Sequence, residues 1–169
     1  FHITLDLHKN ILILQQTDKE GTVEQPVDFM VNKAPINKTS FKLVNNSIIV
    51  PVTIANKKLL FCLDTGAEAS VLSSLLSKRV LTSFTVAKRS ILLGTGGTTV
   101  EVLAGKLDKI TIGSEHYYNM NALVSNLEGL GKAYGQNIDG MIGYDFLTKG
   151  IVSISFAKKE LCLYPFDEE

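Results

Sequence analysis

The feature that most constrains the fold of this chain is an alternation of apolar and polar residues with a period of two. Residues 1–7 read FHITLDL, with an apolar side chain at every odd position. Successive side chains of a strand point to opposite faces, so this pattern predicts a half-buried β-strand. Residues 48–54, rich in β-branched side chains, and the apolar run 59–63 predict two more strands. The polar turn at 56–58 joins them into a hairpin that ends at Asp64.

Beyond this hairpin the chain continues as short apolar segments separated by polar or glycine-rich turns. Helical spacing predicts two short helices, over 70–81 and over 144–149, the second ended by Gly150 as a C-cap. Further strands are expected at 91–93, 98–103, 107–112, 118–124, 151–156 and 160–164. The pattern therefore predicts a mostly β fold, a single closed-barrel-like domain with one or two short helices.

The first forty residues differ from the remainder of the chain. Residues 19–40 hold Pro26, Pro35 and several Asn and Lys, with a short alternating patch at 27–31. We interpret this segment as an extended lead-in with edge strands. The expected organisation is an N-terminal extension over 1–40 and a main domain over 41–169.

Composition argues against several classes of partner. Seventeen Lys plus Arg balance seventeen Asp plus Glu, and no run of like charges favours nucleic acid. The longest apolar runs are four or five residues, whereas a transmembrane helix needs about 20. No basic segment leads into a long apolar stretch at the N-terminus, so no signal peptide is visible. An exported protein whose signal has been removed and a cytoplasmic protein both stay open.

The cysteines and histidines do not have the spacing of a metal site. Cys62 and Cys162 lie 100 positions apart, and the three histidines are scattered. We expect the two thiols to behave as buried small hydrophobic groups, with a disulfide as the alternative if their strands are neighbours. No metal ion and no cofactor are predicted.

The most informative segment is LFCLDTGA at residues 60–67, where an apolar strand leads directly into a Thr-Gly turn. On local chemistry alone, Asp64 is an Asp that begins a turn after a strand. The tetrapeptide Asp64-Thr65-Gly66-Ala67 resembles the active-site signature of aspartic peptidases. The next four residues, Glu68 to Val71, keep the pattern of retropepsins.

Two further segments strengthen this resemblance. Residues 138–147, IDGMIGYDFL, are similar to the second signature of the same family, two hydrophobic residues and a glycine leading into a short helix. Between the motifs, LLGTGGTT at 92–99 stands where the family has its glycine-rich flap hairpin. The three elements occur in the right order, and the resemblance covers about residues 41–165. The chain is thus identified as similar to single-domain, retropepsin-like aspartic peptidases, including those of bacteria.

The resemblance implies hydrolysis of a peptide or protein substrate by water held between two carboxylates that share one proton about 3 Å apart. The chain has one Asp-Thr-Gly and no Asp-Ser-Gly, so the second carboxylate must come from a second copy, and a homodimer is expected. The implied catalytic residues are Asp64, Thr65 and Gly66. The implied substrate-binding residues are Ala67, Glu68, Gly94, Thr95, Gly96 and Gly97.

Alternatives remain open for the protein as a whole. A catalytically inactive peptide-binding module on the same fold is the main one, since a fold does not dictate function. The chain as one piece of a larger protein, with residues 1–40 docked on a missing part, is another. A nucleotide-binding loop at 94–99 is rejected, because the final Gly of G-x-G-x-x-G is missing and the next segment is strand-like.

The chain departs from its relatives at two positions. Ala67 replaces the Ser of pepsin-like enzymes, which removes a potential hydrogen-bond donor, and a less acidic pH optimum is expected. Tyr144 stands where retroviral enzymes often carry an Arg that pairs with the residue at Glu68. Asp139 and Asp145 are expected to be structural, the first in a turn and the second as a helix cap.

Overall fold

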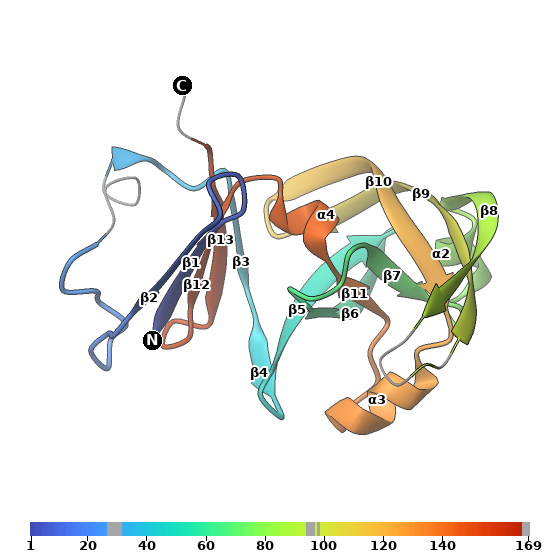
Figure 1. Cartoon of the computed structure of the whole chain (residues 1–169), viewed down its shortest axis with the longest axis horizontal. Coiled ribbons are helices and arrows are strands. Elements are labelled where there is room, and N and C mark those ends of the chain that lie inside the picture. The colour runs from blue at the N-terminus through green and yellow to red at the C-terminus, as the bar shows by residue number, and fades with distance from the viewer. Residues whose placement is uncertain (27–31, 94–96, 98, 167–169) are drawn as a thin grey trace.

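The computed structural model describes residues 1–26, 32–93, 97 and 99–166, and these fold into two β-sheets (Figure 1). The smaller sheet has five strands in the order β2-β1-β12-β13-β3. They are β1 (His2–Asp6), β2 (Ile11–Gln15), β3 (Asn37–Ser40), β12 (Ile151–Ser155) and β13 (Glu160–Tyr164). The first forty residues therefore supply β1, β2 and β3 to a sheet completed by the closing hairpin.

The larger sheet has eight strands in the order β4-β5-β6-β11-β7-β10-β9-β8. They are β4 (Lys42–Val44), β5 (Ser47–Ile54), β6 (Lys57–Leu63), β7 (Ser70–Ser73), β8 (Phe84–Leu93), β9 (Thr99–Ile112), β10 (Glu115–Ser125) and β11 (Gly140–Ile142). An additional pairing of β5 with β9 curls this sheet part of the way into a ring. The described helices are α2 (Lys78–Leu81), α3 (Glu128–Tyr134) and α4 (Tyr144–Leu147). The mostly β prediction is confirmed, but the large sheet is only partly closed.

The main hydrophobic core joins the two sheets. Phe61 of β6 and Ile112 of β9 pack in one cluster with Val152 of β12 and Leu161 of β13, and all four are 0–1% exposed. Phe146 of α4 belongs to the same cluster, and this helix lies between the two sheets in Figure 1. Burial of such side chains contributes about 1.5–3 kcal/mol each. None of the helices among the described residues is long and apolar enough to span a membrane.

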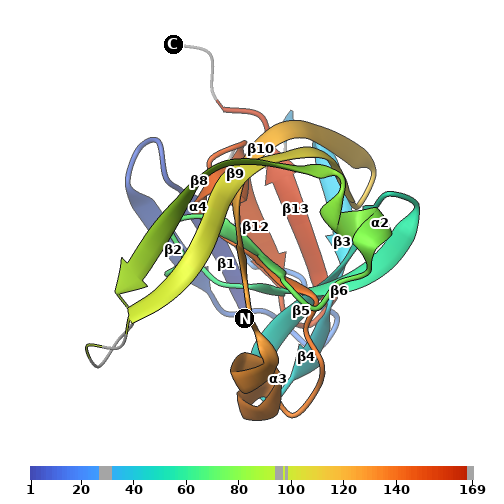
Figure 2. The same cartoon turned by 90° about the vertical axis from the view of Figure 1, so that its right-hand side faces the viewer.

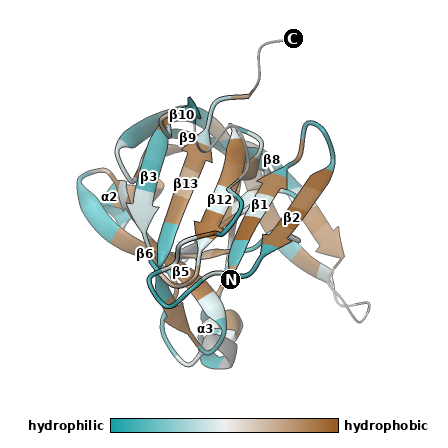
Figure 3. Cartoon of the chain, turned by 90° about the vertical axis from the view of Figure 1, so that its left-hand side faces the viewer, coloured by the Kyte–Doolittle hydropathy of each residue, from teal (hydrophilic) through white to brown (hydrophobic). Residues whose placement is uncertain are grey.

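Figure 3 views the smaller sheet face-on, with β1 between β2 and β12. His2, Thr4 and Asp6 of β1 are all buried, so both faces of this strand are largely covered, although the alternation predicts one solvated face. His2 Nε2 lies 3.0 Å from Ser153 Oγ. The pKa of His2 is lowered, chiefly by burial, which favours the neutral ring.

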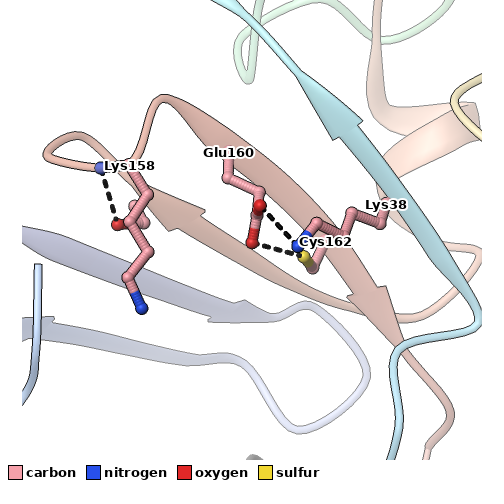
Figure 4. Close-up of polar contacts among 5 residues, drawn as sticks. Lys38, Lys158, Glu160 and Cys162 are labelled. Atoms are coloured by element: carbon pink, nitrogen blue, oxygen red, sulfur yellow. Dashed lines mark hydrogen bonds and ion pairs between the residues drawn. The ribbon is translucent and has the colours of Figure 1, made fainter.

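Cys162 lies on β13 beside an ion pair (Figure 4). Lys38 Nζ is 2.6 Å from Glu160 Oε2, and the Cys162 thiol donates a 3.7 Å hydrogen bond to Glu160 Oε1. Burial, aided by the Glu160 charge, raises the pKa of Cys162 to about 11, so the thiol stays protonated at neutral pH. Cys62 and Cys162 are both buried and no disulfide joins them, as expected.

Most predicted strands are confirmed, including the β5–β6 hairpin that ends at Asp64 and the closing β12–β13 hairpin. The helix predicted over 70–81 is wrong in its first half. Residues 70–73 form β7, which is buried and pairs with β10 on one side and β11 on the other. A short apolar run fits both the period of two of a strand and the period of 3.6 of a helix. Here the run is a strand because it pairs with β10 and β11. Within this range only Lys78–Leu81 is helical.

Three smaller differences separate the predicted elements from the observed ones. The strands predicted at 98–103 and 107–112 are one continuous strand, β9. Helix α3 was not predicted. The C-cap of α4 is Thr148, with a φ of −80° and a ψ of 2°, and not Gly150. Gly150 instead lies against the closing hairpin, where an added Cβ would be 2.5 Å from the Tyr164 carbonyl oxygen.

Candidate active site

Asp64 lies where β6 ends. Its amide donates a 3.0 Å hydrogen bond to the carbonyl oxygen of Ile142, the last residue of β11. The half-buried side chain turns back on its own loop, with Oδ1 accepting a 2.9 Å bond from the Gly66 amide. A Cβ added to Gly66 would be 3.3 Å from Oδ1, so glycine leaves room for the carboxylate. Thr65 and Gly66 are exposed.

Residues 64–70, here called the Asp64 loop, rest on residues 142–145, here called the supporting segment. The Ala67 carbonyl oxygen accepts a 2.8 Å bond from the Tyr144 amide. A Cβ added to Gly143 would be 2.7 Å from the Ala67 carbonyl oxygen and 2.8 Å from that of Ala69. Only glycine permits this close approach, which explains the Gly of the second motif.

Ser70 and Asp145 form a side-chain contact between the loop and the supporting segment. The Ser70 amide and hydroxyl both donate to Asp145 Oδ1, at 3.0 and 2.8 Å. Burial raises the pKa of Asp145, while the bonds from Ser70 and the amides of Asp145 and Phe146 oppose that shift. The N-cap of α4 is Gly143, so the predicted capping role of Asp145 is wrong, although its role here is structural.

Asp139 is also structural, but not through a turn. Its Oδ2 accepts a 2.9 Å bond from the Leu60 amide, and its own amide donates to the Leu60 carbonyl oxygen at 2.8 Å. Asp139 therefore joins the start of β11 to β6. The two carboxylates of the second motif, Asp139 and Asp145, thus both hold segments next to Asp64 in place.

A groove opens beside Asp64, here called the Asp64 groove, with a volume of about 410 Å³. Asp64 and Thr65 line it together with Ile3 and Leu5 of β1 and Leu12 of β2. Its other lining residues are Asn46, Ser47, Ile48, Cys62, Leu63, Ile154 and Phe156. No sequence pattern signals that the N-terminal hairpin lies beside Asp64, because this contact depends on the pairing of β1 with β12.

The predicted flap corresponds to a long hairpin of β8 and β9, whose pairing extends to Leu93 opposite Thr99 (Figure 2). Ile91 and Leu93 near its end are 70% and 76% exposed. Gly97 has a φ of +80°, a conformation that favours glycine. Three of the predicted substrate-binding residues, Gly94, Thr95 and Gly96, lie outside the described residues. Of the other predicted contacts, Glu68 is exposed and Ala67 is half-buried.

Comparison with known proteins agrees with this geometry. A family model described as aspartyl protease matches residues 50–146, more than half of the chain. No curated protein matches the chain. Among solved structures, a retropepsin-like aspartic protease from Rickettsia conorii has a TM-score of 0.52 at 17% sequence identity, covering 75% of this chain and 96% of that one. The chain therefore belongs to the aspartyl protease family, and it is an aspartic peptidase, a hydrolase, with a retropepsin-like fold.

Proposed function

We propose that this protein is an aspartic endopeptidase in which two Asp64 carboxylates, one from each of two copies, activate the attacking water. The observation that carries the proposal is the position of Asp64, at the end of an apolar strand, fixed to Ile142 and lining a groove. The ionised carboxylate takes a proton from water, whose oxygen attacks the peptide carbonyl carbon. The protonated carboxyl gives its proton to the carbonyl oxygen. Collapse of the resulting diol breaks the C–N bond, and the amine leaves with a proton.

The second copy is required because the chain supplies one Asp-Thr-Gly. Asp139 and Asp145, the carboxylates of the second motif, are engaged with Leu60 and Ser70. A two-fold axis beside Asp64 brings the same residue of a second copy to the site. The apolar residues of the Asp64 groove support this arrangement, since a second copy would remove them from water.

The substrate fits best as an extended peptide between the Asp64 loop and the β8–β9 hairpin. The main chain of such a peptide forms strand-like hydrogen bonds with the protein. These bonds select for an extended shape more than for a particular sequence. A residue without a side chain, such as Gly97, permits a close approach of backbone to backbone. The exposed apolar side chains of Ile91, Leu93 and Val100 near the end of the hairpin favour substrates with apolar residues at some positions.

The test is cleavage of a denatured, fluorescently quenched protein substrate across pH 3–8. We expect activity in the native protein, inhibition by a statine-type transition-state mimic, and a loss of about 10³-fold or more in Asp64→Asn. Asp108→Asn is the matched control, because Asp108 is an exposed carboxylate on β9. Equal activity of Asp64→Asn and the native protein would contradict the proposal. A folded native protein that binds the mimic without cleaving would favour the peptide-binding alternative.

A further inference from the structure

The contact between Ser70 and Asp145 spans 75 positions of sequence and joins the end of the Asp64 loop to the first turn of α4. Asp145 Oδ1 accepts from the Ser70 amide at 3.0 Å and from the Ser70 hydroxyl at 2.8 Å. The same hydroxyl oxygen accepts a 3.2 Å bond from the Gly143 amide. Because Ser70 Oγ donates on one side and accepts on the other, its rotamer is fixed.

This contact is partly buried. Ser70 is 5% exposed, and β7, which it begins, is buried along its length. Asp145 Oδ2 is itself buried and has no hydrogen-bond partner among the described residues. A carboxylate with one buried, unpartnered oxygen is unfavourable for stability. Leucine here would leave the Ser70 amide and hydroxyl without the acceptor that Asp145 Oδ1 provides, so the carboxylate holds Ser70 in place.

The Asp64 loop is held to the supporting segment at both ends. At the start, the Asp64 amide donates to the Ile142 carbonyl oxygen, and at Ala67 the carbonyl oxygen accepts from the Tyr144 amide. At the far end, Ser70 and the Asp145 side chain complete the attachment. A shift of Asp145 would therefore be passed through Ser70 to the turn that carries Asp64.

We propose that Asp145 is a positioning residue for peptide hydrolysis: by holding Ser70, it fixes the Asp64 loop in the conformation in which Asp64 meets the carboxylate of the second copy. Asp145 does not touch substrate, and it acts through Ser70. The inference rests on the proposed function, because it assigns a role within that site. It predicts an effect on the rate of the chemical step more than on substrate binding.

The experiment compares Asp145→Leu, Asp145→Asn and Ser70→Ala in the full chain, with kcat and KM measured separately. A misplacement of about 1 Å costs on the order of 100-fold, so Asp145→Leu is expected to lower kcat about 100-fold with KM within about threefold. Asp145→Asn keeps the acceptor oxygen and adds a donor at the unpartnered position, so kcat should return to within about fivefold of the native value. Ser70→Ala should fall between these two, and it keeps the proposal testable if Asp145→Leu does not fold.

Asp6→Leu is the matched control. Asp6 is buried where Asp145 is half-buried, and its Oδ1 also accepts two hydrogen bonds, from the amides of His8 and Lys9, but it contacts no residue of the Asp64 loop through them. We expect Asp6→Leu to lower stability without changing kcat of the folded protein. A loss of kcat in Asp6→Leu equal to that in Asp145→Leu would overturn the proposal. So would unchanged kcat in both Asp145→Leu and Ser70→Ala.

Amide hydrogen exchange separates failure of this inference from failure of the proposed function. We expect Asp145→Leu to lower protection of the Ala67 and Ser70 amides about tenfold or more, while protection in β12 stays native. An inactive native protein that still shows this selective loss would refute the proposed function and leave Asp145 as the residue that holds the loop. Unchanged protection of the Asp64 loop would refute the positioning role, whatever the activity.

Discussion

The main-chain amide of Asp64 donates a 3.0 Å hydrogen bond to the carbonyl oxygen of Ile142. This bond continues the parallel pairing of β6 with β11, in which Leu63 lies opposite Ile142. It joins the two sequence motifs at the point where the first delivers its carboxylate. The second motif therefore supports the Asp64 loop.

Subunit mixing tests whether two copies share one site. Asp64→Asn is added to native protein in equal amount and allowed to exchange before activity is measured. If heterodimers are inactive, random pairing leaves each native chain a native partner about half the time, so activity falls to about half. A catalyst that acts as a monomer would keep its full activity in the mixture.

Self-association should depend on the apolar side chains of the N-terminal hairpin. Leu12 lines the Asp64 groove and is 67% exposed. We expect Leu12→Glu to raise the dimer dissociation constant at least about tenfold, because association no longer removes an apolar side chain from water. Leu75→Glu is the control, since Leu75 is 65% exposed and does not line that groove. Sedimentation velocity at several concentrations gives the comparison, and equal effects of the two variants would argue against this surface.

The close contact at Gly143 predicts a large difference between two glycine substitutions. Gly143→Ala would place a Cβ 2.7 Å from the Ala67 carbonyl oxygen, and overpacking of this kind costs about 1–3 kcal/mol. Gly129→Ala in α3 meets nothing within 4 Å, so it should raise stability by up to about 1 kcal/mol through helix propensity. Urea unfolding of both variants gives the free energies. A neutral Gly143→Ala would mean that the Asp64 loop adapts easily.

The raised pKa of Asp145 predicts how stability depends on pH. Burial raises this pKa above its usual value of 3.8, so folding favours the protonated carboxyl. That contribution is fully present below pH 3.8 and is lost as pH rises through the pKa of the folded state. Asp145→Asn does not titrate, so its free energy of unfolding should rise relative to that of the native protein between about pH 3 and 7. Asp108→Asn controls for the loss of one negative charge, and the opposite trend would contradict the assignment.

The alanine at position 67 predicts a less acidic pH optimum than in pepsin-like enzymes. Ala67→Ser would add a hydroxyl donor in the Asp64 loop, and donors favour the charged form of a carboxyl group. We therefore expect the pH–rate profile of Ala67→Ser to shift toward acid relative to that of the native protein. A native profile that peaks well below about pH 4 would contradict this interpretation.

Local pattern was sufficient to predict the strands that carry the site. The β5–β6 hairpin, the closing hairpin and the position of Asp64 at a strand end can all be read from alternation, turns and apolar runs of short length. The prediction for Ser70–Ser73 failed because so short a segment has too few positions to separate a period of two from one of 3.6. Its strand conformation depends on β10 and β11, which lie far away in sequence.

The partners of the site residues were harder to predict than the residues themselves. Nothing local to Asp145 signals that it accepts hydrogen bonds from Ser70, 75 positions earlier. The burial of His2, Thr4 and Asp6 is a similar case, since polar residues on a strand normally indicate a solvated face. Both depend on how strands are ordered within a sheet, and a single sequence contains little information on that order.

The long separation between Leu63 and Ile142 has a consequence for biosynthesis. Parallel pairing across such a distance forms late, because a long loop must close before its contacts are made. The smaller sheet closes later still, since β1 pairs with β12 near the other end of the described chain. The Asp64 loop therefore gains its attachment to Ile142 and Tyr144 only after residues 142–145 have been synthesised, long after Asp64 itself.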